Sequence, residues 1–302
     1  MLKLEGRTAV VTGAASGMGR AIATSLARRG CHLALADIDD DGLQHTAAEI
    51  IAAGVRISRH HLDVSDAGAV AAFPPRVTAE HPGVDILVNN AGVALGGAFE
   101  QVADADFDWL FAINFWGVVR MTRAFLPLLH KSEEARIVNI SSVFGLIAPP
   151  GQTAYSASKF AVRGFSESLR HELARTNIGV TVVHPGGVAT SISESARMAQ
   201  SISEEEVAER RERAKAFLRL PPEVAGEVIV RGIENRRARV LVGADAKRMA
   251  IVERLMPVTY WNLLGRAFRR CVSIGTPEGR HPRHHRKVEI CLPKGHASLW
   301  KT

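Results

Sequence analysis

Short runs of strand-forming residues alternate with helical patterns along most of this chain, and this alternation restricts its fold more than any other feature. Strands are expected at Arg7–Val11, His32–Ala36, Val55–His61, Asp85–Val88, Arg136–Ile140, Gly179–Val183 and Arg239–Val242. Regular alternation predicts a mostly parallel sheet, and continuously apolar strands predict helices on both of its faces. We therefore expect an α/β fold with a doubly wound parallel sheet of about seven strands.

One of the expected helices contains an interruption. The helices span Gly17–Arg29, Asp39–Ala53, Asp66–Glu80, Asp104–His130 and Gln152–Arg175, and another starts near Pro222. Pro74 and Pro75 fall in the middle of the third helix, where a proline removes a hydrogen-bond donor and clashes with the preceding turn, at a cost of about 3 kcal/mol or more. That helix should therefore be short, kinked or split.

The 302 residues fit one α/β domain with a terminal extension, or two small domains. We divide the chain into an α/β domain at residues 1–245, a helical extension at 246–271 that packs on the core or on a partner, and a basic, disordered tail at 272–302. We expect no signal peptide and no membrane-spanning stretch. The three cysteines are scattered, which indicates a cytoplasmic protein with reduced thiols.

The net charge of +7 comes from the C-terminal end. Residues 266–302 hold nine lysines and arginines against Glu278 and Glu289, so the first 265 residues are neutral. A nucleic-acid partner is therefore not expected for the α/β domain. Apolar and aromatic residues stand beside arginines from Arg254 to Arg270; this run could lie on a membrane surface, cover a neighbouring subunit or pack on its own domain. The C-terminal histidines lack zinc-site spacing, so no metal is expected.

The first expected strand leads into Thr-Gly-Ala-Ala-Ser-Gly-Met-Gly, from Thr12 to Gly19. Glycines between a strand and a helix allow a tight turn and a close approach of the backbone to a pyrophosphate, and the helix N-terminus attracts that anion. Asp37 closes the second strand, where a carboxylate can hold the ribose hydroxyls of a dinucleotide and repel a 2′-phosphate. Since Ser16 and Ile38 are uncharged, NAD is favoured over NADP; the alternative is that Asp37 only caps a helix.

Tyr155 precedes Lys159 by four residues, which places both side chains on one face of the helix expected there. A phenol has an ordinary pKa of about 10, and a nearby ammonium group lowers that pKa because it favours the phenolate. The pair is therefore a candidate proton donor and acceptor for an alcohol or a carbonyl. By itself the spacing is weak evidence, since many such pairs are a half-buried ring beside a solvated amine.

In combination, these motifs resemble the short-chain dehydrogenase/reductase family in its common one-domain, Rossmann-type form. The resemblance covers about residues 5–245. It rests on motifs in the family order: Thr12–Gly19, Asp63-Val64, Asn89-Asn90-Ala91-Gly92, Asn114, Ser142, Tyr155 with Lys159, and Pro185-Gly186 followed by Val188 and Thr190. Ser142 is chosen over Ser141 because it lies at the family's distance before Tyr155.

The resemblance implies a role for each of these residues. The catalytic set would be Asn114, Ser142, Tyr155 and Lys159. Cofactor contacts would come from Gly13, Ser16, Gly17, Met18, Gly19, Asp37, Asp63, Val64, Asn90, Ala91, Gly92, Tyr155, Lys159, Pro185, Gly186, Val188 and Thr190. Ser142 would hold the substrate oxygen against Tyr155, which moves the proton. Lys159 would lower the pKa of the tyrosine, and Asn114 would distort its helix and hold a water of the proton relay.

These roles predict an NAD-dependent oxidoreductase that interconverts a secondary alcohol and a ketone, with NADP as the less favoured cofactor. The apolar residues Val143, Phe144, Leu146 and Ile147 favour a hydrophobic substrate, although core packing explains them equally well. Because family members commonly form dimers or tetramers, a homo-oligomer is expected. Two alternatives stay open: an NADP-dependent ketone reductase, and an NAD-binding protein that acts at a membrane or nucleic-acid surface through its basic C-terminus.

Overall fold

The computed structural model describes residues 1–269, and the tail expected at 272–302 lies outside the described residues. Seven strands form one sheet in the order β3-β2-β1-β4-β6-β7-β9, and every neighbouring pair runs parallel. The strands are β1 (Thr8–Thr12), β2 (His32–Asp37), β3 (Ile57–His61), β4 (Ile86–Asn89), β6 (Ala135–Ile140), β7 (Ile178–Pro185) and β9 (Arg239–Val242). The doubly wound parallel sheet expected from the sequence is confirmed.

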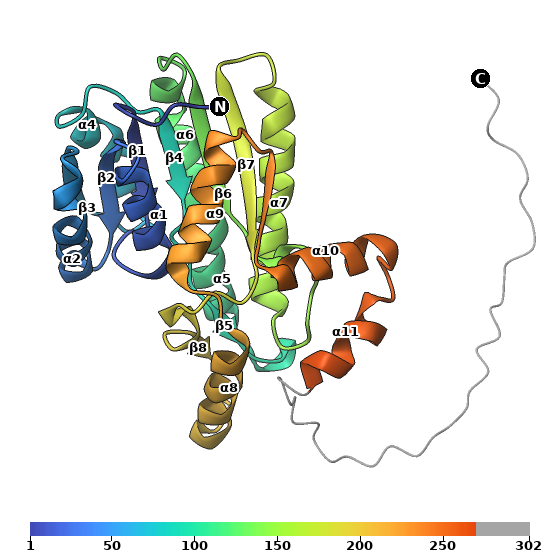
Figure 1. Ribbon diagram of the computed structural model, residues 1–302. Coiled ribbons are helices and arrows are strands. Elements are labelled where there is room, and N and C mark those ends of the chain that lie inside the picture. Colours follow the sequence, from blue (N-terminus) through green and yellow to red (C-terminus); the bar gives the residue numbers. More distant parts are fainter. Residues whose placement is uncertain (270–302) are drawn as a thin grey trace, which may run out of the picture.

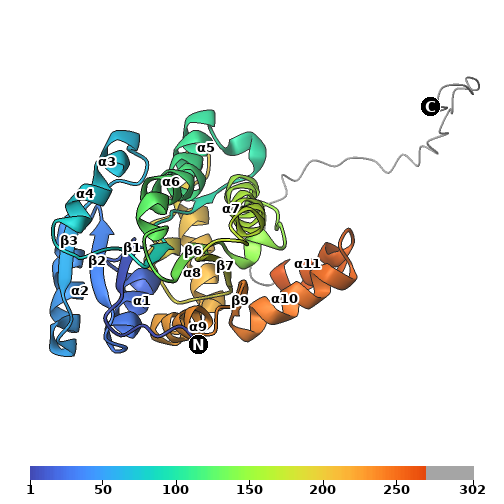
Figure 2. The same ribbon diagram turned by 90° about the horizontal axis from the view of Figure 1, so that it is seen from above.

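Helices cover both faces of the sheet, as the view from above in Figure 2 shows. One face carries α1 (Gly17–Ala27), α2 (Asp40–Ile50) and α9 (Pro222–Glu234); the other carries α3 (Ala67–Ala71), α4 (Phe73–Thr78), α5 (Asp104–Phe111), α6 (Val118–Leu129) and α7 (Thr153–Glu172). Alternate residues of β1 serve the two cores. Ala9 and Val11 belong to the core beneath α1 and α9, whereas Val10 belongs to the opposite core with Phe73 and Phe125. Burial on both sides explains why the strands are apolar throughout.

Two of the expected helices are interrupted. The helix expected at Asp66–Glu80 is split into α3 and α4 at Ala72, and Pro74 and Pro75 occupy the first turn of α4, where the N–H groups have no helical partner in any case. The helix expected at Asp104–His130 contains a π-helical turn at Ala112–Gly117, between α5 and α6. The prolines explain the first interruption. The second surrounds Asn114, where the family resemblance implied a distorted helix.

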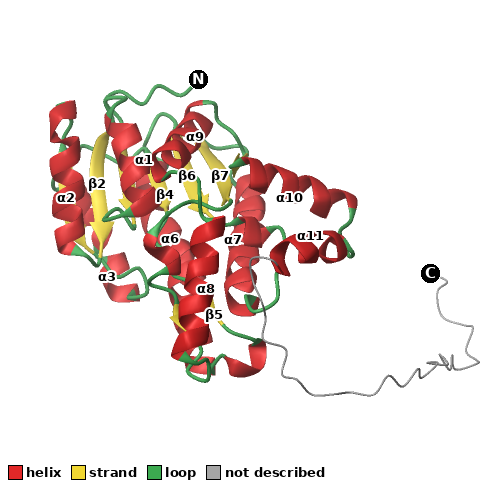
Figure 3. Cartoon of the chain, turned by 60° about the horizontal axis from the view of Figure 1, so that its bottom comes forward, coloured by secondary structure: helices red, strands yellow, loops and turns green. Residues whose placement is uncertain are grey.

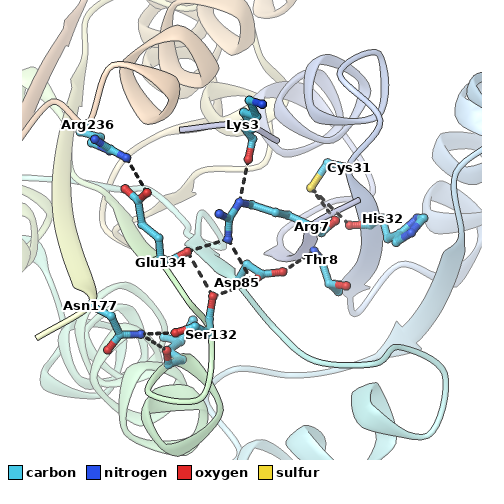
Figure 4. A network of polar contacts seen from close by, with 11 residues as sticks. Lys3, Arg7, Thr8, Cys31, His32, Asp85, Ser132, Glu134, Asn177 and Arg236 are labelled. Carbon is cyan, nitrogen blue, oxygen red and sulfur yellow. Dashed lines mark hydrogen bonds and ion pairs between the residues drawn. The ribbon is translucent and has the colours of Figure 1, made fainter. Parts of the chain in front are cut away.

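A polar network joins the amino ends of three central strands (Figure 4). The carboxylate of Asp85, just before β4, accepts hydrogen bonds from the backbone N–H of Thr8 (2.8 Å) and the hydroxyl of Ser132 (2.6 Å), and it pairs with Arg7 (3.3 Å). Arg7 also donates to the backbone oxygen of Glu134, which precedes β6 (2.8 Å). These polar groups therefore bind one another and stabilise the fold at this edge. Ligands of open α/β sheets bind at the opposite edge, outside the carboxyl ends of the strands.

Beyond the last strand, α10 (Ala244–Leu255) and α11 (Tyr260–Arg269) project beside α7 (Figure 1). Ala246 and Met249 of α10 pack on Val143 and Ile147, which follow β6. The C-terminal region is thus helical as far as Arg269. A two-stranded sheet, β5 (Leu95–Gly96) with β8 (Arg197–Met198), and α8 (Glu204–Phe217) lie beyond the carboxyl edge (Figure 1). Figure 3 brings β5 and α8 to the front. Within residues 1–269, no helix has the length and apolar character needed to cross a bilayer.

Candidate active site

The glycine-rich turn between β1 and α1 has a backbone shape that requires glycine. Gly13 and Gly17 have φ angles of 65° and 51°, which residues with a Cβ rarely adopt. A Cβ on Gly19 would collide with the backbone oxygen of Gly13. The side-chain amide of Asn90 holds the turn, because it donates to the backbone oxygens of Thr12 (3.0 Å) and Gly13 (3.1 Å). The turn expected from the sequence is therefore present and braced from the end of β4.

Helix α1 presents its N-terminus at the same edge. Ser16 is the N-cap residue, and its side chain makes no capping hydrogen bond. The first turn carries no acidic residue, so the N–H groups and the positive end of the helix dipole suit an anion. Thr190 lies against this turn, since a Cβ on Gly17 would be 3.1 Å from its methyl carbon, whereas Met18 packs on the core. The turn and helix together fit the pyrophosphate of a dinucleotide.

Asp37 ends β2 beside the glycine-rich turn. Its half-buried carboxylate accepts hydrogen bonds from the backbone N–H groups of Ala15 (3.0 Å) and Ile38 (2.8 Å), so it orders the turn as well as placing a negative charge there. Arg20, which the sequence reasoning overlooked, is a cation close to the same turn. Its guanidinium donates to the backbone oxygen of Ala15 (2.5 Å) and pairs with Glu49 (3.5 Å), so it is engaged by the protein itself.

Asp63 and Val64 follow β3, which neighbours β2 in the sheet. Asp63 is exposed, and its carboxylate accepts a hydrogen bond from the backbone N–H of Ser65 (2.8 Å). Val64 is buried, and its side chain lies against Gly117 of the π-helical turn. Asp37 and Asp63 therefore stand at the ends of neighbouring strands, on the β3 side of the carboxyl edge.

The segment after β4 links the glycine-rich turn to the catalytic candidates. The backbone N–H of Ala91 donates to Oγ1 of Thr12 (3.1 Å), which ties the segment to β1. A Cβ on Gly92 would be 3.1 Å from Oδ1 of Asn114 and 3.4 Å from Nζ of Lys159. Gly92 thus lies where the cofactor candidates and the catalytic candidates meet.

Asn114 lies in the π-helical turn and is fully buried. Its Oδ1 accepts a hydrogen bond from the backbone N–H of Val93 (2.8 Å), and its Nδ2 donates to the backbone oxygen of Val93 (3.0 Å) and to Oγ of Ser158 (3.3 Å). Ser158 in turn donates to the backbone oxygen of Tyr155 (2.7 Å). Asn114 therefore joins the segment after β4 to α7. Single π-helical turns of this kind are frequent at functional sites.

Tyr155 and Lys159 lie one turn apart on α7, as their spacing predicted. Nζ of Lys159 is 5.7 Å from the centre of the Tyr155 ring and donates to the backbone oxygen of Ile140, at the end of β6 (3.2 Å). The lysine is buried, and burial lowers its pKa to about 8. Both its ammonium and its neutral form are therefore populated at mildly alkaline pH.

The pKa of Tyr155 moves opposite to the direction expected. Burial raises the pKa of the phenol, and a hydrogen bond with the side chain of Ser142 offsets part of the rise. The lowering by the ammonium group of Lys159 that the sequence predicted is not seen in this structure. The physical reason is desolvation, because the buried Lys159 and the half-buried Tyr155 both lose contact with water and so resist ionisation.

The two serines after β6 have separate contacts. Ser141 is buried, and its hydroxyl donates to the backbone oxygen of Lys159 (2.8 Å). The side chain of Ser142 lies beside the phenol of Tyr155, and its Oγ accepts a hydrogen bond from the backbone N–H of Phe144 (3.1 Å). Phe144 meets the tyrosine ring edge-on, with ring centres 6.2 Å apart. Ser141 therefore anchors α7, whereas Ser142 holds its hydroxyl beside the phenol.

Two polar residues at this edge were missed by the sequence reasoning. His184 on β7 is fully buried, and its Nδ1 lies 2.9 Å from the backbone oxygen of Ser142. Burial lowers the pKa of His184 to about 4, so the imidazole is neutral at physiological pH. Asp245 accepts a hydrogen bond from the backbone N–H of Gly187 (2.7 Å), and its carboxylate lies against Gly186. The sequence did contain a signal for them, since each is a polar residue at or just past the carboxyl end of an expected strand, where ligands bind.

The chain after β7 folds across the carboxyl edge. Pro185 ends β7, and Val188 forms an isolated β-bridge with the segment that precedes α9. Farther along the chain, between Val188 and α8, strand β8 pairs with β5. The guanidinium of Arg197 in β8 lies 3.6 Å from the centre of the Trp109 ring and pairs with Asp106 (3.2 Å). These contacts hold the segment against α5, close to the helix that carries Tyr155.

Comparison with known families adds the observation that decides the assignment: residues 7–201 match the family described as short chain dehydrogenase. This chain belongs to the short-chain dehydrogenase family. It is therefore an oxidoreductase of that type, and its glycine-rich turn, Asn114, Ser142, Tyr155 and Lys159 occur on the elements described above.

Several proteins resemble this short-chain dehydrogenase over most of its length. The putative oxidoreductase SadH of Mycobacterium tuberculosis is 43% identical over 266 residues, and the match covers 87% of this chain and 96% of SadH. A short-chain dehydrogenase/reductase of Burkholderia phymatum, solved in complex with NAD, is 30% identical with a TM-score of 0.76, covering 84% of this chain and 95% of that one. An alcohol dehydrogenase of Thermococcus sibiricus, complexed with 5-hydroxy-NADP, is 29% identical with a TM-score of 0.66, covering 78% and 94%.

Proposed function

We propose that this short-chain dehydrogenase interconverts a secondary alcohol and a ketone by hydride transfer with NAD. The observation that carries the proposal is the position of the Ser142 side chain beside the phenol of Tyr155, with Lys159 one helical turn away. A hydroxyl beside a phenol can bind one substrate oxygen between them and exchange its proton. The bound nicotinamide would accept or supply the hydride.

The contacts of each residue support a distinct part in this reaction. Ser142 holds the substrate oxygen, and Tyr155 removes its proton during oxidation or returns one during reduction. Lys159 lies one helical turn from the phenol, and its Nζ ties α7 to the end of β6 by donating to the backbone oxygen of Ile140 (3.2 Å). Asn114 positions α7 through its hydrogen bonds to Val93 and Ser158, in addition to the water relay that the family resemblance implies.

A nicotinamide dinucleotide fits the glycine-rich turn and the N-terminus of α1, because both require or favour close contact with a pyrophosphate. NAD is proposed over NADP because Asp37 places a carboxylate where a 2′-phosphate would be repelled. Arg20 does not offset that charge freely, since Ala15 and Glu49 engage it. The Burkholderia protein binds NAD and the Thermococcus protein an NADP derivative, so the preference rests on Asp37.

The proposed substrate is hydrophobic. Of the apolar residues expected in the pocket, Val143 and Ile147 are buried against α10 and belong to the core, whereas Phe144 packs on Tyr155. Tyr155 also packs on an apolar cluster that includes Leu95. A carbon skeleton bound next to the phenol would therefore meet apolar side chains.

We also propose that the protein forms a homo-oligomer through the outer face of α7 and the adjoining π-helical turn. Trp116 and Phe160 are exposed there, and Phe115 packs on both Trp116 and Phe165. Gly164 lies on the same helix with open space where a Cβ would be, which permits a close approach. Light scattering should give a multiple of the chain mass, and Phe160→Glu should reduce it; a monomer at all concentrations would contradict this assembly.

A panel of secondary alcohols and ketones tests the activity. Each compound is incubated with the protein and either NAD or NADP, and the nicotinamide absorbance is followed. The proposal predicts turnover of apolar compounds with a preference for NAD. Turnover with NADP alone would make the protein an NADP-dependent reductase, and NAD binding without turnover of any compound would make it a binding protein.

A further inference from the structure

The corner between α10 and α11 is an exposed apolar surface. The α10–α11 corner consists of Ile251, Leu255, Val258 and Leu263, whose exposed fractions are 59%, 75%, 88% and 56%. Twelve large hydrophobic side chains are exposed among those that the structure describes, and these four fall within a stretch of thirteen residues. The corner projects from the body of the protein beside α7 (Figures 1 and 2). Exposed apolar side chains that cluster in this way mark a contact site for a partner or a membrane.

Cations border this apolar surface. Lys247, Arg248 and Arg254 are exposed on α10, and within residues 1–269 their side chains make no hydrogen bond or ion pair. Lys247 and Arg248 precede Ile251 by four and three residues, so they share its face of the helix. Residues 247–263 contain one acidic residue, Glu253, and it is half-buried. The exposed charges of this stretch are therefore positive.

We propose that the α10–α11 corner docks the protein on an anionic lipid surface. Apolar side chains that enter the headgroup region and cations that contact anionic headgroups are the two features of such binding. The charge of the corner selects this occupant over two others. A second copy that met the corner across a two-fold axis would bring the same three cations face to face. Residues 270–302 carry seven lysines and arginines against two glutamates, so they too have the wrong sign to cover it.

The corner is connected to the candidate active site. The hydroxyl of Tyr260, at the start of α11, accepts a hydrogen bond from the backbone N–H of Ala148 (3.0 Å). Trp261 and Leu264 of α11 pack in one cluster with Phe144, which contacts Tyr155. Helix α11 therefore links the corner to the substrate side of the site, and an apolar substrate dissolved in the membrane could enter along it. This last consequence rests on the proposed function, whereas the docking itself does not.

Vesicle flotation with the full chain tests the docking without any substrate. The protein is mixed with vesicles of phosphatidylcholine alone or of phosphatidylcholine with phosphatidylglycerol, at low and high salt. We expect binding to the mixed vesicles that weakens at high salt. Leu255→Glu combined with Val258→Glu removes apolar contacts and should lower the partition coefficient by about tenfold or more. Arg254→Gln removes a contact with the anionic headgroups and should lower it about fivefold.

Matched variants separate docking from general effects. Ile51→Glu replaces an equally exposed apolar residue just after the end of α2, and Arg28→Gln removes an exposed cation from the end of α1; neither should change vesicle binding. If the paired glutamates lower the thermal midpoint, Arg254→Gln with Lys247→Gln serves instead. Equal binding to neutral vesicles, binding that these variants leave unchanged, or a fall in oligomer mass in place of lost vesicle binding would each overturn the proposal.

Discussion

The hydroxyl of Ser141 donates a hydrogen bond of 2.8 Å to the backbone oxygen of Lys159, which joins the end of β6 to α7. The side chain of the next residue, Ser142, lies beside the phenol of Tyr155 instead. Ser141 therefore holds α7 against the end of β6, and Ser142 lies beside the phenol that α7 carries.

Alanine substitutions should separate these two effects. Ser141→Ala removes a buried hydrogen bond and should lower the free energy of unfolding by about 1 kcal/mol, with turnover changed only a few-fold. Ser142→Ala loses the hydrogen bond from Phe144 and should lower the free energy of unfolding by a similar amount, but it should lower kcat by about 100-fold, because the substrate oxygen loses its partner. Denaturant titrations and steady-state kinetics of both variants measure the two quantities. A larger loss of kcat in Ser141→Ala than in Ser142→Ala would reverse the assignment.

The lowered pKa of Lys159 should appear in the pH dependence of stability. The folded pKa of about 8 lies below the ordinary value of 10.5, so between these pH values the unfolded chain binds the proton and the folded chain does not. The stability of the native protein, relative to Lys159→Met, should therefore rise from pH 8 to 10.5, by up to about 3 kcal/mol. Below pH 8 the difference should be constant. Urea titrations across that range check this, and a flat difference would place the folded pKa at its ordinary value.

Cofactor preference should depend on the charge of Asp37. Asp37→Asn keeps an oxygen that can accept from the backbone N–H of Ala15, but it removes the negative charge beside the turn. The ratio of kcat/KM with NAD to that with NADP should fall by about tenfold or more, which corresponds to about 1.4 kcal/mol. Asp63→Asn, one strand away, is the control and should change the ratio less. An unchanged ratio in Asp37→Asn would remove Asp37 from the account of specificity.

The contact of Arg197 with Trp109 should affect substrate binding more than chemistry. Arg197→Gln removes a cation–π contact of 3.6 Å and the ion pair with Asp106, so the segment around β8 is held less firmly against α5. We expect KM for the substrate to rise about fivefold, in line with a contact of about 1 kcal/mol, with kcat nearly unchanged. Arg210→Gln breaks an ion pair within α8 and serves as control. If kcat falls and KM does not, the segment has a part in the chemical step.

Local patterns were sufficient to predict the sheet and much of the site. Each strand is a short apolar run followed by glycine or a polar residue, and parallel order brings the carboxyl ends together. For this reason Gly13, Asp37, Asn90 and Ser142 could be expected at one edge before any geometry was known. The Tyr155–Lys159 spacing predicted their shared helix face correctly, because it depends only on helical periodicity.

What could not be predicted depends on contacts between distant segments. Asn114 donates a hydrogen bond to Ser158 on α7, and Arg197 packs on the ring of Trp109. No local sequence pattern relates the residues of either pair. Burial decided the pKa direction of Tyr155, and burial follows from packing of the whole domain. The ion pair of Arg20 likewise depends on a distant segment, because its partner Glu49 belongs to α2.

The replacement of Tyr155 by phenylalanine tests the central claim most directly, because it removes one hydroxyl and keeps the ring. With an apolar secondary alcohol and NAD, the account predicts that kcat falls by roughly 100-fold to 10,000-fold, the usual contribution of a general acid or base. The affinity for NAD and the thermal midpoint should stay close to those of the native protein. Turnover by Tyr155→Phe within a few-fold of the native rate would contradict the assignment of Tyr155 as the residue that moves the proton.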